Sequence, residues 1–197
     1  PTPGKPNEKK IEASHSENKN STKPNANSAS KVRINEYSTT KTQTILDSDG
    51  DFESWVELYN SGENDADLSG LFLSDDAANK EKWAFPNGCI IKSGGYLLVF
   101  LSGKEKEYKS GGELHAAFKL NGKEEKLYLF DKSKKELSSI EVFDLFSNLS
   151  CGIDSNGKTV FFSKSTPGAE NGASGFDKIE SAAKTKSKEL VITEVAA

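Results

Sequence analysis

Chemically specialised residues are scarce in this chain. It contains no methionine, one arginine, two cysteines and two histidines among 197 residues. One arginine leaves almost no material for bidentate recognition of phosphate or carboxylate groups. Acidic and basic residues are interspersed at a net charge of −4, and no apolar run approaches the roughly 20 residues that a membrane-spanning helix needs. These absences argue against a nucleic-acid partner and against a membrane span.

Recognisable catalytic motifs are missing as well. The sequence has no GxSxG, no HExxH and no phosphate-binding glycine loop. His115 cannot build a zinc site with cysteines this distant, and no serine or cysteine stands beside it in a nucleophile motif. Cys89 and Cys151 are too far apart for a CxxC motif, so a long-range disulfide and two buried free thiols are both open. We therefore expect no enzyme and no cofactor.

Apolar side chains are unevenly distributed. Only 34% of the residues are hydrophobic, below the roughly 45–50% of an average globular chain. Residues 1–30 hold almost no large apolar side chain beyond Ile11, whereas residues 31–162 hold nearly all of them. This distribution predicts one normal core diluted by polar flanks.

Short alternating segments separated by turn signals fill the apolar region. This pattern, without a convincing helix, is typical of an all-β sandwich. Residues 96–101, YLLVFL, are predicted to be buried on both faces. The only helical pattern, at 176–184, is short and marginal in water. The predicted strands cover 31–37, 53–59, 66–73 with a bulge at Gly70, 82–85, 89–91, 96–101, 114–120, 126–130, 137–142, 149–153 and 159–162.

The end of the chain repeats its beginning. TPG at 166–168 matches TPG at 2–4, and LVITEV at 190–195 is similar to VRINEY at 32–37. The simplest explanation is a fragment of a tandem array, expected to be monomeric. We predict the end of one repeat at 1–7, a flexible linker at 8–30, a β-sandwich at 31–172, a second linker at 173–188 and the first strand of the next repeat at 189–197.

Several spaced blocks within the sandwich resemble the lamin tail domain in its bacterial form. They are INEY, DGDFESWVELYN, DLSGLFLSDD, KWAFPNG, GGYLLVF, CGIDSNG and STPGAEN, in the order of the family, from Val32 to about Asn171. The resemblance implies an immunoglobulin-like β-sandwich without catalytic machinery of its own. It also implies an accessory module of a secreted or cell-surface protein, because the bacterial relatives occur in such proteins.

An acidic loop offers one candidate metal site. Asp47, Asp49 and Asp51 alternate around Gly50, with Glu53 just beyond. Alternate carboxylates on a bent loop are ligands that calcium accepts, but the spacing is not that of an EF-hand, and calcium usually takes six to eight oxygens. We favour a solvated loop whose acids cap turns and keep calcium as the alternative.

Trp55 and Trp83 are candidate contact residues. A partly exposed tryptophan could stack on a sugar or a peptide. Trp55 alternates with Val56 and Leu58, and the sequence does not decide which face is buried. We favour a core position for both tryptophans.

Two functional hypotheses follow. The first is a non-catalytic structural or interaction module, extracellular or at the cell surface, whose partners are other domains or proteins there. The alternative is a ligand-binding module for carbohydrate, nucleic acid or envelope that targets an enzyme domain elsewhere in the full-length protein.

Overall fold

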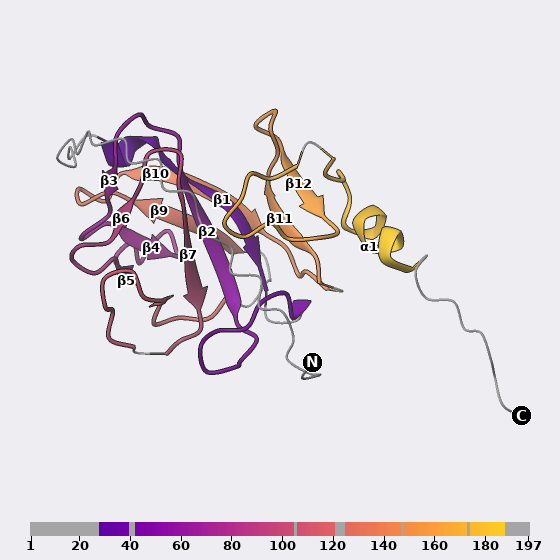
Figure 1. Ribbon diagram of the computed structural model, residues 1–197, viewed down its shortest axis with the longest axis horizontal. Coiled ribbons are helices and arrows are strands. Elements are labelled where there is room, and N and C mark those ends of the chain that lie inside the picture. The colour runs from indigo at the N-terminus through magenta and orange to yellow at the C-terminus, as the bar shows by residue number, and fades with distance from the viewer. Residues whose placement is uncertain are drawn as a thin grey trace, which may run out of the picture.

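The computed structural model describes residues 28–39, 42–104, 106–120, 125–146, 148–172 and 174–187. Strands dominate these residues (Figure 1). The elements in chain order are η1 (Ser28–Lys31), β1 (Val32–Ser38), β2 (Ser54–Asn60), β3 (Ala66–Asp67), β4 (Phe72–Ser74), β5 (Trp83–Ala84), β6 (Ile90–Ile91), β7 (Tyr96–Leu101), β8 (Leu114–His115), β9 (Glu125–Phe130), β10 (Glu136–Val142), β11 (Ser150–Ile153), β12 (Thr159–Phe162) and α1 (Ile179–Ser187).

The strands form two main sheets that pack face to face. The larger sheet has the order β12-β11-β1-β2-β7-β8, and the smaller one has the order β10-β9-β4-β5. β3 and β6 form a separate two-stranded ribbon. Neighbouring strands are antiparallel except for β7 and β8, which are parallel. The all-β immunoglobulin-like sandwich predicted from the sequence is confirmed.

Alternation along β2 explains how one strand serves two environments. Val56 and Leu58 point into the core between the sheets, whereas Trp55, Glu57 and Tyr59 point to the outer face of the six-stranded sheet. Every β2 residue except Tyr59 is nevertheless buried. Both faces are shielded because loops fold over the outer face, and these loops carry the polar clusters described below.

A tyrosine ties the two sheets together. Tyr37 on β1 is fully buried, and its hydroxyl donates to the carbonyl of Glu141 at 3.1 Å. The same oxygen accepts the N–H of Phe143 at 2.8 Å. The β1 backbone adds a second link, because the N–H of Ile34 donates to Ser138 Oγ at 3.0 Å. These bonds fix β10 against β1 and satisfy polar groups that would otherwise be buried without partners.

Two predicted strands differ from the observed ones. The segment 66–73 is not one strand with a bulge, because Gly70 adopts a φ of 71° and turns the chain between β3 and β4. The Gly70 N–H then donates to the Phe85 carbonyl at 2.9 Å. The segment 114–120 is paired as a strand only over β8, and Lys119 adds an isolated bridge to Ser102.

The C-terminal flank differs from the linker predicted at 173–188. Phe176 exchanges two backbone hydrogen bonds of 2.8 Å with Phe161 of β12. α1 follows and lies beside β12 (Figure 1). Ala182 on α1 is fully buried. The segment folds onto the sandwich because its apolar residues cover the end of β12. At the other flank the buried Ala29 belongs to the fold, and the repeat segments 1–7 and 189–197, with most of the linker 8–30, lie outside the described residues.

Both cysteines are free and buried. Burial raises the pKa of each thiol to about 12, so neither is a reactive thiolate at neutral pH. Of the two alternatives that the sequence left open, the structure has the free thiols. No helix in the described part of the chain is long and apolar enough to cross a membrane.

Candidate functional site

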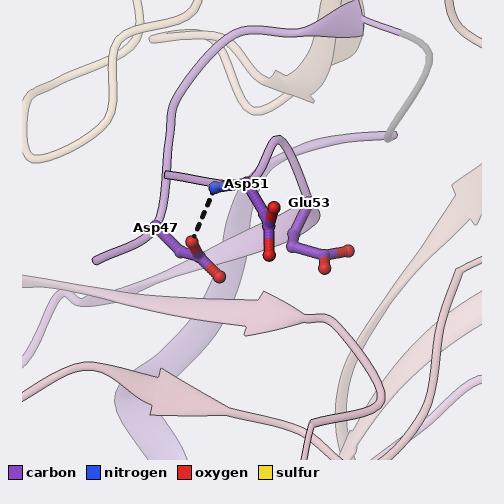
Figure 2. Close-up of side chains that lie close together, drawn as sticks. All are labelled: Asp47, Asp51 and Glu53. Atoms are coloured by element: carbon purple, nitrogen blue, oxygen red, sulfur yellow. Dashed lines mark hydrogen bonds between the residues drawn. The ribbon is translucent and has the colours of Figure 1, made fainter. Parts of the chain in front are cut away.

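The acidic loop between β1 and β2 is a compact turn. Asp47 Oδ1 accepts the N–H groups of Asp49 at 3.0 Å and of Asp51 at 2.9 Å. A carboxylate that receives two backbone N–H groups in this way stabilises the turn. The loop places oxygens of Asp47, Asp51 and Glu53 within 4.8 Å of one another (Figure 2). Glu53 thus joins the cluster more closely than the predicted Asp49.

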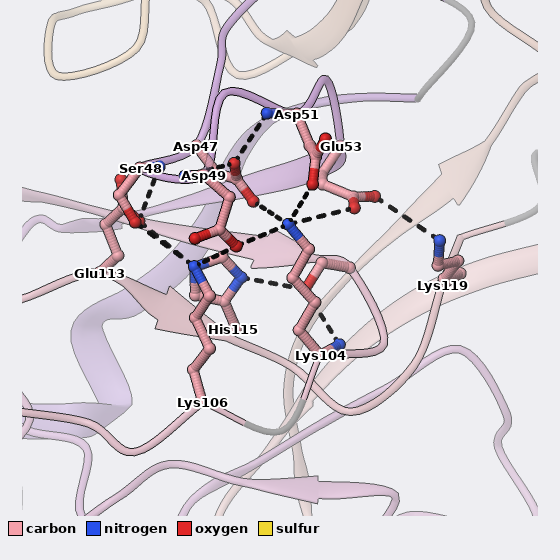
Figure 3. A network of polar contacts seen from close by, with 11 residues as sticks. Asp47, Ser48, Asp49, Asp51, Glu53, Lys104, Lys106, Glu113, His115 and Lys119 are labelled. Carbon is pink, nitrogen blue, oxygen red and sulfur yellow. Dashed lines mark hydrogen bonds and ion pairs between the residues drawn. The ribbon is translucent and has the colours of Figure 1, made fainter.

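Lys104 supplies the cation for this cluster. Its ammonium lies 2.5 Å from Asp47 Oδ2, 2.7 Å from Asp51 Oδ2 and 3.0 Å from Asp49 Oδ2, with Glu53 at 3.7 Å (Figure 3). Burial opposes ionisation of Asp47, but hydrogen bonds from Lys104 and the loop N–H groups outweigh it and lower the pKa to about 2. The position between the acids is therefore held by the chain's own ammonium group.

The calcium alternative can be tested at this lysine. We expect millimolar calcium to leave the melting temperature unchanged, because Lys104 Nζ lies among the carboxylates that calcium would need. We expect Lys104→Met to lower the melting temperature, because four carboxylates lose their shared cation. Lys109→Met, in the same loop but exposed, is the matched control and should have little effect. A rise in melting temperature of the unmodified protein with calcium would contradict this expectation.

A serine, a histidine and a glutamate meet beside the cluster. His115 Nδ1 lies 3.0 Å from Ser102 Oγ. His115 Nε2 lies 3.3 Å from Glu113 Oε2 (Figure 3). The sequence did not predict this trio, because the parallel pairing of β7 and β8 alone brings Ser102 beside His115.

The trio lacks the features of a nucleophile site. Ser102 is only 1% exposed, and its oxygen already accepts the N–H of Lys104 at 3.2 Å. No substrate carbonyl could approach that oxygen without opening the sheet edge. Glu113 also accepts the N–H of Ser48 at 3.1 Å. The trio therefore joins the 102–113 loop to the acidic loop.

The two tryptophans occupy different environments. Trp55 is fully buried, and its indole N–H donates to Thr44 Oγ1 at 2.6 Å. Trp83 is half-buried and packs edge-on against Phe85, with 4.8 Å between ring centroids. Trp55 therefore cannot touch a ligand while the 42–53 loop covers it. Trp83 also packs against the core.

A second polar cluster joins β1 and β2 to the loop after β12. Glu36 and Glu57 lie opposite one another in the β1–β2 register, and both side chains are fully buried. Glu36 accepts the N–H of Thr166 at 3.0 Å and the hydroxyls of Thr166 and Ser150. Glu57 accepts the N–H of Gly168 and, at 3.0 Å, Asn35 Nδ2. We call these contacts, with those of Asn171 below, the carboxylate clamp.

Asn171 completes the clamp. Its Nδ2 donates to the carbonyls of Ile153 at 2.9 Å and of Asn35 at 3.0 Å. Its Oδ1 accepts Asn35 Nδ2 at 3.3 Å and lies 3.0 Å from Thr166 Oγ1, whose single proton it shares with Glu36. The close approach requires glycine at 152, since a Cβ there would lie 2.5 Å from the Asn35 carbonyl oxygen. Burial raises the pKa of Glu57 to about 7 and also raises that of Glu36.

The residues of the clamp come from three of the sequence blocks that resemble the family, and the clamp gives these blocks a structural role. INEY supplies Glu36, WVELYN supplies Glu57, and STPGAEN supplies Thr166, Gly168 and Asn171. The contacts between these residues lie within the fold and hold the three blocks together.

Comparison with known families decides what this architecture is. The family described as Lamin Tail Domain matches residues 25–144, more than half of the chain. The chain belongs to the lamin tail domain family. The matched stretch includes both buried glutamates and the acidic loop but ends before β11, β12 and the clamp loop at 166–171. In this lamin tail domain those later segments complete the six-stranded sheet. No curated protein gives a significant match.

The family sets the broad function. A lamin tail domain is an immunoglobulin-like interaction module that is generally non-catalytic. Function in such a fold depends on the surface that the module presents.

Proposed function

We propose that this lamin tail domain is a non-catalytic interaction module of a larger secreted or cell-surface protein. The observation that carries the proposal is the internal use of its ionisable groups. The carboxylates with raised pKa, Glu36 and Glu57, are held by backbone and side-chain donors of the clamp. No buried side-chain nitrogen or oxygen among the described residues lacks a hydrogen-bond partner.

The hydrogen bonds that these buried groups make within the fold bear directly on catalysis. A general acid or base needs a proton-transfer partner on the substrate within hydrogen-bond reach. Glu36 and Glu57 are fully shielded by residues 166–171, and Ser102 is covered at the edge of β7. The resemblance to bacterial members in secreted and surface proteins supports the extracellular part of the proposal.

The proposed location can be tested on the full-length protein in its own cells. We expect antibodies raised against this domain to label intact cells, or to detect the domain in the culture fluid. An antibody against a cytoplasmic protein is the control and should label permeabilised cells only. Labelling of this domain that requires permeabilisation would contradict the proposed location.

A second candidate function is targeting of an attached enzyme through ligand binding. One observation favours it: a pocket of about 290 Å³ opens on the outer face of the six-stranded sheet, lined partly by Arg33, Tyr59 and Tyr96. Pockets of ordinary ligand sites begin at about this size. A spacer would not need such a pocket, so binding assays separate the two functions.

A further inference from the structure

The outer face of the six-stranded sheet carries three rows of cross-strand neighbours, and loops cover two of them. One row contains Trp55, which lies beneath Thr44 of the acidic loop. The next contains Glu36 and Glu57, which lie beneath residues 166–171 in the carboxylate clamp. The third row is only partly covered, and its residues belong neither to the acidic cluster nor to the carboxylate clamp.

The third row is an arginine followed by two tyrosines. Arg33 on β1 pairs with Tyr59 on β2, and Tyr59 pairs with Tyr96 on β7. The guanidinium carbon lies 5.3 Å from the Tyr59 ring centroid. The two tyrosine rings are 4.8 Å apart, with 31° between their planes. All three side chains are half-buried, so each keeps accessible surface.

This row forms one side of the 290 Å³ pocket, and the other side is polar. Ser155, Glu170 and Asp154 also line it. Ser155 and Glu170 are exposed, whereas Asp154 is buried and accepts the N–H of Lys158 at 2.8 Å. The pocket thus has aromatic groups, one strong donor and free acceptors within the same small volume.

The pocket is also held in shape before a ligand arrives. Asn35 and Asn171, which line it, belong to the carboxylate clamp. Because those two side chains are locked by buried hydrogen bonds, they need no further ordering when a ligand binds. Tyrosine adds contact area at low entropy cost, since few of its torsions must be fixed.

We propose that this pocket binds a sugar residue of a neutral glycan. The proposal rests on the proposed function, since it names the ligand class of a binding module. Tyr59 packs between Arg33 and Tyr96, so the sugar ring lies against the accessible edges of Tyr59 and Tyr96, and its hydroxyls accept from Arg33 and donate to Glu170. A hydroxyl group is both donor and acceptor, so a polyhydroxylated ring matches a pocket that offers both.

The charges of the pocket oppose other ligand classes. A nucleic acid or an acidic glycan would bring its anions to Glu170 and Asp154, and a single guanidinium does not outweigh two carboxylates. A fully apolar ligand would strip water from Arg33 and Glu170 without replacing their hydrogen bonds. A neutral sugar avoids both costs.

The test is isothermal titration of the whole 197-residue chain with neutral oligosaccharides. Cellohexaose, xylohexaose, mannohexaose and chitohexaose are the probes, and we expect at least one to bind. Tyr96→Ala should weaken that binding at least about tenfold through loss of the aromatic contact area that this ring offers the sugar. Glu170→Gln should weaken it about three- to tenfold, because a charged acceptor is replaced by a neutral amide.

Tyr128→Ala is the matched control. Tyr128 on β9 is also half-buried and stacks on an aromatic neighbour, with its centroid 5.5 Å from that of Phe130, but it lies outside the pocket. It should leave sugar binding unchanged. Equal loss in Tyr128→Ala and Tyr96→Ala, or no binding of any oligosaccharide, would overturn the sugar proposal.

Two further results separate this proposal from the proposed function. Binding of a proline-rich peptide that depends on Tyr96, without sugar binding, would overturn the sugar proposal and leave an interaction module. Release of shorter oligosaccharides during the titration would instead overturn the non-catalytic function.

Discussion

Asn171→Ala is expected to lower the free energy of unfolding by about 2–5 kcal/mol. The side chain is 3% exposed and makes four hydrogen bonds within the clamp. Alanine would leave the carbonyl oxygens of Asn35 and Ile153 without their Asn171 donor, and each buried group left unsatisfied costs about 1–3 kcal/mol. Urea denaturation followed by tryptophan fluorescence measures the change, since Trp55 is buried in the fold.

Asn156→Ala is the control for this loss. Asn156 is exposed in the turn between β11 and β12, and its side chain makes one weak contact of 3.5 Å with Asp154. The same chemical change there should cost no more than about 0.5 kcal/mol. If Asn171→Ala proved as mild as Asn156→Ala, the clamp would not hold the C-terminal loop on the sheet.

The stability of the domain is expected to fall as the pH rises from about 4.5 to about 7. Glu57 has a pKa of about 7 in the folded protein because burial disfavours its charge, against 4.5 for an ordinary glutamate. The folded state therefore binds this proton more tightly than the unfolded chain does. The resulting stabilisation is full below about pH 4.5 and is lost through about pH 7, by on the order of 2–3 kcal/mol. Glu36 acts in the same direction.

Variants isolate the glutamate responsible for this slope. Glu57→Gln should remove most of the pH dependence between pH 5 and pH 8, because the group no longer titrates. Glu141→Gln, at an exposed glutamate on β10, should keep the slope of the unmodified protein. The acids with lowered pKa, such as Asp47, titrate below this window. Stability that is flat or rises with pH in the unmodified protein would contradict a buried, readily protonated Glu57.

The strands of the sandwich could be predicted well because alternation is a local signal. The segment 96–101 coincides with β7, and the segment 159–162 coincides with β12. The prediction was wrong where one residue changed the chain direction: Gly70 reads as a bulge in sequence, yet its positive φ ends one strand and begins another. Burial of β7 on both faces was also only half right, since its first three residues stay partly exposed.

The clamp could not be predicted from residue chemistry. Glu36 and Thr166 are 130 positions apart, and a glutamate in an alternating strand ordinarily predicts a solvent-facing side chain. Glu36 is buried only because the loop after β12 covers the outer face of the six-stranded sheet at this position. The family resemblance placed these residues in named blocks, but it did not say that their carboxylates hold the blocks together.

The partner of the acidic loop could not be predicted from the sequence either. Asp47, Asp49 and Asp51, which alternate in the sequence, all contact Lys104 in the structure. The lysine that contacts all three lies more than 50 positions later in the chain. Which side chain pairs with such a cluster depends on the tertiary fold, so it cannot be predicted from the spacing of residues in the sequence.

Binding without catalysis is tested most directly by an NMR titration of the ¹⁵N-labelled chain with the neutral oligosaccharides, followed for a day. We expect chemical-shift changes confined to the surroundings of Arg33, Tyr59 and Tyr96, with the oligosaccharide left intact. Shift changes centred on Ser102 and His115, or the appearance of new reducing ends, would contradict a module that binds without catalysing.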